Sequence, residues 1–460
     1  YLPAPVGAGA GLDTDWVDIQ PGEYVTCGIR PDDDLWCWGD TSYGDIGIDA
    51  PLLTWYTQPT ATQIEGPVAW STAELAANVA CGILSADDSL WCWGQNWSFQ
   101  LGSGERGYQM RPLQIDAGSW IDLSVGGNTN CGIDGSHALW CWGDNGTGQL
   151  GINANDGPER WGWVDNQVGS TVPLQESTGA TDWQQVSTTG AVVCGIREDA
   201  GGARTAWCWG EGRFGQLGHN LLGEAKADKW MPTEVGVGDV APPADAGVDA
   251  GVIWEDTWAQ IETGGDHTCG IRDDGMGERT LWCWGYNYNG QLGNGTSGSG
   301  TEVTLPTQEA TYSTNWESLS MKYAWGCAIK TDGTLWCWGS NYSGRLGTGG
   351  GDKNVPTQVG SDTDWASVAT STFWHACGVK DDGSLWCWGD NQKGAFGDGT
   401  TSGSSSPRRV GTANDWAQTS GGNYSSCHRK TNGTVWCSGW NIAGQMATGE
   451  PWFEYPQLLP

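Results

Sequence analysis

Cysteine is the residue type of this chain whose number and spacing are most regular, so its chemistry comes first. The chain has 16 cysteines among 460 residues. Eight of them lie in a Trp-Cys-Trp-Gly motif or in its variant Trp436-Cys437-Ser438-Gly439, and each has a partner ten to fourteen residues upstream. Metal binding is disfavoured because the pairs lack Cys-x-x-Cys spacing and no histidine recurs beside them. An even count at fixed spacing predicts local disulfides. The predicted bonds are Cys27–Cys37, Cys81–Cys92, Cys131–Cys141, Cys194–Cys208, Cys269–Cys283, Cys327–Cys337, Cys377–Cys387 and Cys427–Cys437.

A hairpin must bring each pair together, and its register follows from the sequence. In the cleanest copy, the turn signal Asp382-Gly383 lets Cys377 face Cys387, which places Gly378 opposite Trp386. Because side chains alternate along a strand, both indoles of the motif lie on one face and the disulfide on the other. We expect the first indole to cover the glycine opposite it. Both faces are apolar, which predicts strands packed between neighbouring sheets.

The cysteine motif recurs with a period near 50 residues, which indicates a tandem array and one domain over 1–460. Short segments rich in β-branched and aromatic residues, separated by Gly and Asp turns, predict four strands in each repeat and an all-β chain. The expected repeats are approximately 16–69, 70–119, 120–182, 183–257, 258–315, 316–364, 365–415 and 416–460.

A second motif follows each cysteine motif. It reads Trp-Gly-x-Asn-x-x-Gly-Gln-Leu-Gly at 142–151 and 284–293, with Arg for Gln at 338–347. This pattern resembles the regulator-of-chromosome-condensation repeat family. The resemblance implies a β-propeller of four-stranded antiparallel blades, usually seven. Eight copies here predict eight blades, with seven closed blades plus one extra repeat as the alternative. Either 3–7 or 455–458 could pair with the opposite terminus to close the ring.

The charge of the chain limits its partners. It has 54 acidic and 21 basic residues, a net charge of −33, which disfavours nucleic acids and anionic membranes. The sequence has no apolar stretch of about 18 residues, so it predicts no membrane span. The predicted disulfides indicate an oxidising location: secreted, periplasmic or at the cell surface. The chain starts at Tyr1 without Met, and we expect a mature form whose targeting segment has been removed.

Catalytic motifs are missing from the sequence: it has no His-Glu-x-x-His, no Gly-x-Ser-x-Gly and no Walker loop. His267 and His375 occupy the same place, two residues before a cysteine, and we expect them to be structural. No catalytic residue, metal or cofactor is predicted. The sequons at Asn96, Asn341 and Asn432 lie in repeat turns, and they matter only if the host glycosylates proteins.

Aromatic residues outside the repeat pattern are the best candidates for a binding site. Ten of the 33 tryptophans are not explained by the three repeat positions. Two loops of neighbouring repeats carry aromatics at equivalent positions, and the longest insertions, roughly 153–172 and 221–254, include the low-complexity segment 241–251. Clustered exposed aromatics favour a contact surface for protein or glycan, although they could instead cap the blade cores. The candidate binding residues are Trp161, Trp163, Tyr323, Trp325, Phe373 and Trp374.

These observations predict a non-catalytic extracellular or cell-surface scaffold that binds a protein or glycan through loops on one face. A secreted protein that inhibits another protein is a special case of this binding-scaffold hypothesis. The alternative is a structural subunit of an extracellular assembly or fibre, with self-assembly through its terminal strands. An enzyme is a third possibility that lacks a recognisable acid–base set.

Overall fold

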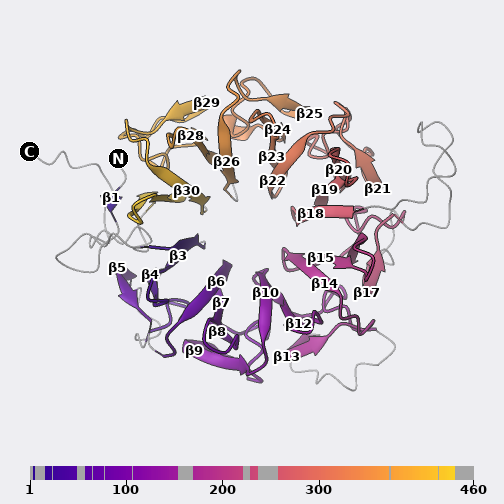
Figure 1. Cartoon of the computed structure of the whole chain (residues 1–460), viewed down its shortest axis with the longest axis vertical. Coiled ribbons are helices and arrows are strands. Elements are labelled where there is room, and N and C mark those ends of the chain that lie inside the picture. The colour runs from indigo at the N-terminus through magenta and orange to yellow at the C-terminus, as the bar shows by residue number, and fades with distance from the viewer. Residues whose placement is uncertain are drawn as a thin grey trace, which may run out of the picture.

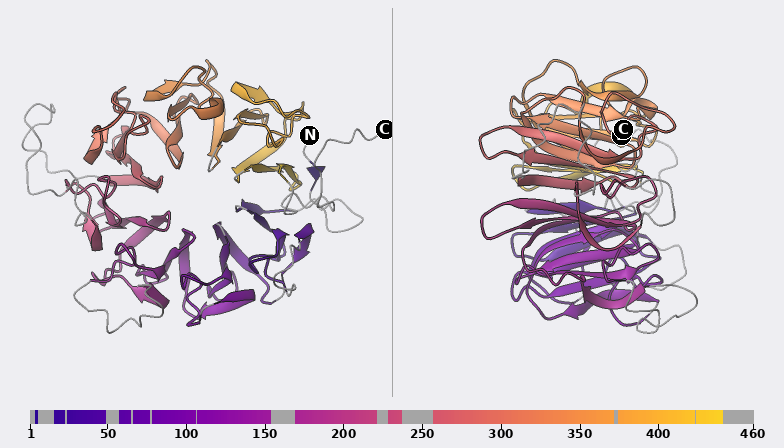
Figure 2. Two further views of the ribbon diagram at one scale, coloured as in Figure 1. Left: turned by 180° about the vertical axis from the view of Figure 1, so that it is seen from behind. Right: turned by 90° about the vertical axis from the view of Figure 1, so that its right-hand side faces the viewer.

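The computed structural model describes residues 4–5, 16–22, 24–48, 57–64, 66–76, 78–105, 107–153, 169–220, 228–236, 257–371, 374–422 and 424–440. These residues form a ring of eight four-stranded antiparallel sheets (Figure 1). Strands β2, β6, β10, β14, β18, β22, β26 and β30 lie nearest the axis of the ring (Figures 1 and 2). The chain is therefore an eight-bladed β-propeller, as the eight motif copies predict. The alternative of seven blades plus a leftover repeat is wrong, because the eighth repeat forms a blade of its own.

Each of the first seven blades uses four consecutive strands. Blades one to four are β2 (Asp18–Pro21), β3 (Val25–Ile29), β4 (Leu35–Asp40), β5 (Thr57–Gln63); β6 (Trp70–Ala76), β7 (Val79–Leu84), β8 (Leu90–Gln95), β9 (Tyr108–Asp116); β10 (Trp120–Val125), β11 (Thr129–Asp134), β12 (Leu139–Asp144), β13 (Gly169–Gln175); and β14 (Trp183–Thr188), β15 (Val192–Glu198), β16 (Arg204–Gly210), β17 (Lys229–Glu234). Blades five to seven are β18 (Thr257–Thr263), β19 (His267–Asp273), β20 (Arg279–Gly285), β21 (Val303–Gln308); β22 (Trp316–Lys322), β23 (Trp325–Lys330), β24 (Leu335–Gly339), β25 (Lys353–Gln358); and β26 (Trp365–Thr370), β27 (His375–Lys380), β28 (Leu385–Gly389), β29 (Ser404–Arg409). A short 3-10 turn, η2 (Tyr342–Gly344), follows β24.

The eighth blade closes the ring with a strand from the other end of the chain. It contains β30 (Trp416–Gly421), β31 (Ser425–Lys430) and β32 (Val435–Gly439), and its outer strand is β1 (Ala4–Pro5). Ala4 pairs with Cys437 and Pro5 with Trp436. Of the two expected closing segments, the N-terminal one is therefore used, while 455–458 lies outside the described residues.

The predicted hairpin register is confirmed in every blade. Cys377 lies opposite Cys387 and Gly378 opposite Trp386, and the same pairing recurs from Gly28 opposite Trp36 to Gly270 opposite Trp282. All 16 cysteines are bonded, each to its partner ten to fourteen residues away, and no free cysteine remains. Each hairpin is thus closed at its centre by a covalent bond.

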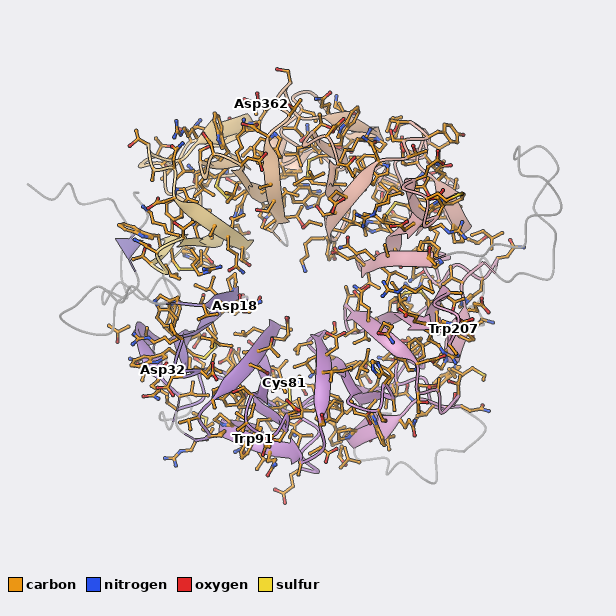
Figure 3. The ribbon with its side chains drawn as sticks, viewed as in Figure 1. Asp18, Asp32, Cys81, Trp91, Trp207 and Asp362 are labelled. Carbon is orange, nitrogen blue, oxygen red and sulfur yellow. A yellow bond between two sulfur atoms is a disulfide. The ribbon has the colours of Figure 1, made fainter. Side chains whose placement is uncertain are left out.

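The core lies between blades. The disulfide Cys27–Cys37 of blade one packs against Trp70 and Trp93 of blade two, and the same disulfide-to-indole contact joins the other neighbours, including Cys427–Cys437 against Trp16 and Trp38 across the closure. Each middle strand is therefore buried on both faces, as predicted. Figure 3 shows that Asp18 lies near the axis of the ring and Trp91 toward its rim.

The prediction that the first indole of Trp-Cys-Trp-Gly covers the glycine opposite is wrong. The space above Gly378 is filled by Trp365, the first residue of the innermost strand, whose ring lies 2.7 Å from where a Cβ would stand. A register shift between Trp365 and Ser367 brings that indole over the glycine. The same arrangement holds for Gly28 under Trp16 and for Gly82 under Trp70.

Candidate functional site

The loops that join the first to the second strand and the third to the fourth strand of a blade leave the sheet at the same end, because the strands are antiparallel. We call this side of the ring the loop face, and the opposite side, which carries the hairpin turns between second and third strands, the turn face. The Trp-Gly-x-Asn-x-x-Gly-Gln-Leu-Gly motif forms the third-to-fourth-strand loops. It therefore builds much of the loop face.

The asparagine of this motif holds its loop together. The Asn287 side-chain oxygen accepts a hydrogen bond from the Leu292 amide at 3.1 Å, and Asn341 accepts one from Leu346 at 2.9 Å. Asn96 does the same for Leu101 at 2.9 Å. Asn96 and Asn341 are also buried, and their Nδ2 groups donate to Ser103 and to the Gly350 carbonyl, so in the folded protein neither sequon presents a free amide nitrogen for glycosylation. Asn432, in contrast, lies in an exposed hairpin turn.

The residue directly after that asparagine is aromatic and exposed in three blades. Trp97, Tyr288 and Tyr342 are 48%, 53% and 61% exposed. Since the buried asparagine fixes the loop, each ring is presented to solvent from a rigid support. Aromatic residues held in this way are typical of protein contact surfaces. Trp97 is one of the ten tryptophans outside the repeat positions, but none of the three was among the predicted binding residues, although their constant place after a repeated asparagine is a signal that could have found them.

Aromatic contacts extend across blades six to eight on this face. The rings of Tyr342 and Trp374 lie 4.5 Å apart, and Trp374 Nε1 donates a hydrogen bond to the Tyr424 hydroxyl at 3.2 Å. Tyr424 meets Trp440 edge-on at 5.6 Å, and the Lys393 ammonium lies 5.6 Å from the Trp440 ring. We call Tyr342, Trp374, Tyr424 and Trp440 the aromatic arc.

A second group of rings lies between blades four and five. Phe214 and Tyr286 are 4.8 Å apart, and Tyr286 stacks on Tyr288 at 6.3 Å. The Arg213 guanidinium lies over the Phe214 ring and forms an ion pair of 3.1 Å with Glu211. The chain thus shows how this surface can hold a cation, between an aromatic ring and a carboxylate.

Acidic residues stand beside these rings. The position before the motif asparagine is acidic at Asp144 and Asp390, and Asp40 and Glu211 hold the same position where threonine or glycine replaces the asparagine. Burial raises the pKa of Asp144. Burial, together with the negative charges of Asp266 and Asp228, raises the pKa of Glu211, although Arg213 opposes that rise. A positive group placed here would relieve the crowding of carboxylates, so the loop face favours cations.

The structure separates the predicted binding residues. Tyr323 lies on the loop face and is 66% exposed, whereas Trp325 is 0% exposed and belongs to the core between blades six and seven. Trp325 is therefore not part of an exposed surface, because its side chain points from β23 into the interface between blades six and seven. Trp374 is half-buried within the aromatic arc. Trp161, Trp163, Phe373 and the insertion 241–251 lie outside the described residues.

The histidines have structural surroundings. His375 is buried, and its Nε2 lies 2.8 Å from the Ser426 hydroxyl. Burial lowers the pKa of His267 and of His375 to about 4, so both are neutral at ordinary pH. His428 lies close to Cys377 and Cys387, but those sulfurs are bonded to each other and are not free to bind a metal.

Comparison with known proteins identifies the repeat. Models of the regulator of chromosome condensation (RCC1) repeat match residues 258–291, 318–345 and 365–395, and also 332–373 and 382–428. The matched part of the chain, within 258–428, carries regulator of chromosome condensation repeats. These RCC1 repeats support the predicted family resemblance in blades five to eight directly, and the same strand order continues through the other blades.

Known proteins with similar sequence or structure fit this assignment. The ultraviolet-B receptor UVR8 of Arabidopsis thaliana is 27% identical over 337 residues, which cover 70% of this chain and 64% of UVR8. Human WBSCR16 superposes with a TM-score of 0.62 at 18% identity, covering 93% of this chain and 99% of that one. Prp20p of Saccharomyces cerevisiae gives 0.61 at 17% identity, with 95% of each chain covered. These two structures have the same overall fold as this chain.

Within the described part of the chain, no helix has the length and apolar character needed to cross a membrane. The eight disulfides, in contrast, are consistent with an oxidising environment.

Proposed function

We propose that this protein is a non-catalytic binding scaffold that acts outside the cytoplasm and holds a protein partner on its loop face. The observation that carries the proposal is the set of exposed aromatic rings at one repeated loop position, Trp97, Tyr288 and Tyr342. Proteins with related repeats support it. UVR8 is a receptor, and Prp20p was described with its binding to Gsp1p and histones.

The partner surface that fits best is basic. The chain carries a net charge of −33, and a field of that sign speeds the approach of a cationic partner. At contact range, Arg213 over Phe214 and Lys393 over Trp440 show the geometry that lysine or arginine of a partner would adopt. The aromatic rings would supply most of the affinity, since buried aromatic anchors dominate interfaces.

A binding experiment can test this proposal with a matched control. Partners are captured from the culture medium and envelope fraction of the source organism and identified, and a glycan array is probed in parallel. The affinity for each identified partner is then measured with wild type, with the triple variant Trp97→Ala, Tyr288→Ala and Tyr342→Ala, and with Tyr312→Ala. Tyr312 is an exposed tyrosine, at 70%, that follows an outermost strand and lies on the turn face.

We expect the triple variant to bind at least tenfold more weakly, since one strong aromatic contact is worth about 2 kcal/mol, and the control to bind as wild type does. Binding should also weaken with added salt. Equal affinity of wild type and triple variant would refute the site. Saturable binding to glycans, with no protein partner, would replace the proposed partner class.

The location outside the cytoplasm rests on the disulfides and has its own test. Protein isolated from its native source in the presence of a thiol-alkylating reagent should carry no alkyl groups until it is reduced. After reduction, all 16 cysteines should be labelled. Labelling of the native protein without reduction would show a reducing compartment and overturn this part of the proposal.

The fibre alternative gains no comparable support. It relied on disulfide-rich rigidity and on spare terminal strands. Of those strands, β1 pairs with β32 of the same chain, and 455–458 lies outside the described residues. We therefore propose the function of a binding scaffold.

A further inference from the structure

Two neighbouring blades have longer hairpins on the turn face than the other six. The disulfides of blades four and five span 14 residues, Cys194–Cys208 and Cys269–Cys283, where the others span 10 or 11. Both hairpins project on the same side of the ring in the right-hand view of Figure 2. Each of their third strands begins with an arginine, Arg204 in β16 and Arg279 in β20.

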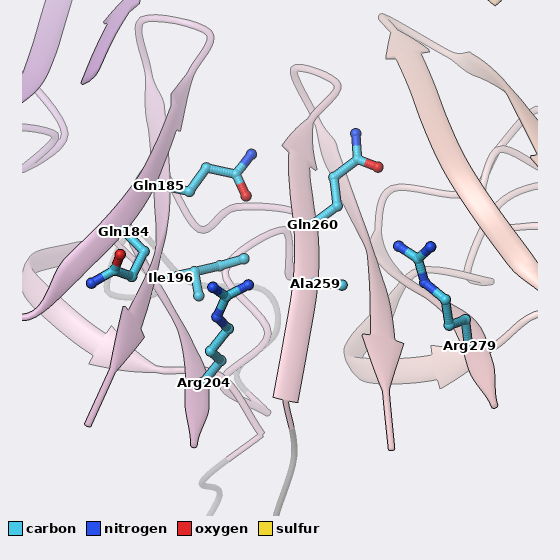
Figure 4. Close-up of a pocket in the computed structure, with 7 residues that line it drawn as sticks. All are labelled: Gln184, Gln185, Ile196, Arg204, Ala259, Gln260 and Arg279. Atoms are coloured by element: carbon cyan, nitrogen blue, oxygen red, sulfur yellow. The ribbon is translucent and has the colours of Figure 1, made fainter. Parts of the chain in front are cut away.

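A pocket of about 400 Å³ lies at the base of these two hairpins, between blades four and five. It is lined by Gln184, Gln185, Ile196, Arg204, Ala259, Gln260 and Arg279. Figure 4 shows the two arginines on either side of the strand that carries Ala259. A small side chain at position 259 leaves this space open, and the volume falls within the range of small-molecule sites.

The walls of the pocket are fixed by hydrogen bonds. The Gln185 side chain donates to the Ile261 carbonyl and accepts from its amide, at 3.2 and 3.3 Å. The Gln260 side chain bonds in the same way to Leu319, at 3.0 and 3.1 Å. These two amides join successive blades, so they cannot move freely to fill the pocket.

The arginines are held in place but keep donor groups to spare. Arg204 uses Nε to bond Glu198 at 2.7 Å, and Arg279 uses Nη1 to bond Glu317 at 2.7 Å. Asp273 lies 3.7 Å from Arg279 Nε. A guanidinium has five N–H donors. Among the described residues, both side chains therefore retain N–H groups that these acids do not use.

We propose that this pocket binds a small organic carboxylate. Guanidinium groups match the two oxygens of a carboxylate in plane and in charge, and two of them line this pocket, one on each side of the strand that carries Ala259. Ile196 and Ala259 supply an apolar contact for the carbon body of the ligand. Glu198 and Glu317 balance the two arginine charges and Asp273 adds a third carboxylate, so the attraction rests on the directed N–H donors and we expect binding in the millimolar range. The site lies on the turn face, apart from the proposed partner surface.

The test is a titration followed by calorimetry or protein NMR at about 0.15 M salt, where the repulsion of anions by the acidic chain is screened. The probes are succinate and glucuronate, with succinamide and glucose as their neutral counterparts. The variants are Arg204→Met with Arg279→Met, and Ala259→Leu, which fills the pocket. Ala366→Leu is the matched control, because Ala366 occupies the equivalent position after the first tryptophan of blade seven. Thermal melts of all variants confirm folding.

We expect at least one carboxylate to bind wild type and the Ala366→Leu control, and to bind at least tenfold more weakly to the other two variants. Preference for succinate identifies an open-chain acid and preference for glucuronate a sugar acid. Equal binding of the neutral probes overturns the proposal. So does the failure of both carboxylates to bind, or undiminished binding after removal of both arginines.

Discussion

The indole Nε1 of Trp338 donates a hydrogen bond of 2.9 Å to the backbone carbonyl of Gln291 in the preceding blade. Trp338 is the second tryptophan of its Trp-Cys-Trp-Gly motif, and Gln291 belongs to the Gly-Gln-Leu-Gly end of the other repeated motif. Trp284 bonds Gln216 in the same way at 2.9 Å. The two sequence motifs are thus halves of one contact, which joins successive blades from blade one to blade eight in the described residues.

Removing the indole donor of Trp338 should lower the stability of the propeller. Trp338→Phe keeps an aromatic ring but leaves the buried Gln291 carbonyl without its partner, which costs about 1–3 kcal/mol. The comparison variant is Trp336→Phe, because the Trp336 indole is only half-buried and donates to Thr334 within its own hairpin. Denaturant midpoints should fall more for Trp338→Phe. Equal shifts would show that ring packing, not the hydrogen bond, is what matters.

The eighth blade offers a natural variant of the same contact. Ser438 replaces the second tryptophan, and its hydroxyl donates to the Ala395 carbonyl at 2.8 Å. The donor is therefore kept even where the indole is lost.

The sequence was sufficient to predict the hairpins but not all of their surroundings. Local disulfides and Asp-Gly turns fix which residues face each other, because a slip of one residue would separate Cys377 from Cys387. The residue that covers Gly378 depends instead on a bulge in the innermost strand, between Trp365 and Ser367, and no turn signal marks that bulge. The exposure of Tyr323 and the burial of Trp325 likewise depend on how blades pack around the ring.

The glycine beneath the first tryptophan is a second point of sensitivity. Gly378→Ala would place a methyl group 2.7 Å from the Trp365 ring and 2.9 Å from the Ser367 carbonyl. This overpacking should lower the free energy of unfolding by about 1–3 kcal/mol. Blade six already has Ala328 at this position, opposite Trp336, and the Trp316–Trp338 ring distance there is 6.3 Å against 5.7 Å for Trp365–Trp388.

Ala328→Gly is the reciprocal variant for this experiment. It removes a methyl group from a site that has adjusted to one, so its thermal midpoint should change less than that of Gly378→Ala. A stable Gly378→Ala protein would show that Trp365 can move as Trp316 has done.

Glu74, on the innermost strand of blade two, should make stability depend on pH. Burial raises its pKa to about 7, and Asp18 and Asp122 add to the rise while Lys322 opposes it. An acid whose pKa is higher in the folded state binds more protons there, so stability is greatest at low pH and decreases between about pH 4.5 and pH 7. Glu74→Gln should therefore raise stability at pH 8 by about 1–3 kcal/mol and change it little at pH 4.5.

Thermal melts of Glu74→Gln and wild type across this pH range provide the measurement. Asp32→Asn is a suitable control, because Asp32 is exposed in a hairpin turn and its removal lowers the net negative charge equally. If both variants raise the pH 8 midpoint by the same amount, general charge repulsion explains the effect and burial of Glu74 does not.

A basic residue three positions after the first cysteine lies between two tryptophans in several blades. The Lys380 ammonium is 5.1 Å from the Trp365 ring and 4.9 Å from the Trp386 ring, and it pairs with Asp362 at 2.6 Å. Lys330 and Lys430 occupy the same position in their blades. A cation enclosed in this way gains from both ring faces.

Lys380→Met should therefore lower stability by about 1–2 kcal/mol, while Lys380→Arg, which keeps the charge, should cost less. An apolar side chain fits the position, since blade two has Leu84 there, buried against the core. Denaturation should be repeated at about 1 M salt, which screens exposed ion pairs. If the cost of Lys380→Met disappears at high salt, the ion pairs of Lys380 with Asp362 and Asp364 explain it. If the cost persists, the two indole rings hold the ammonium.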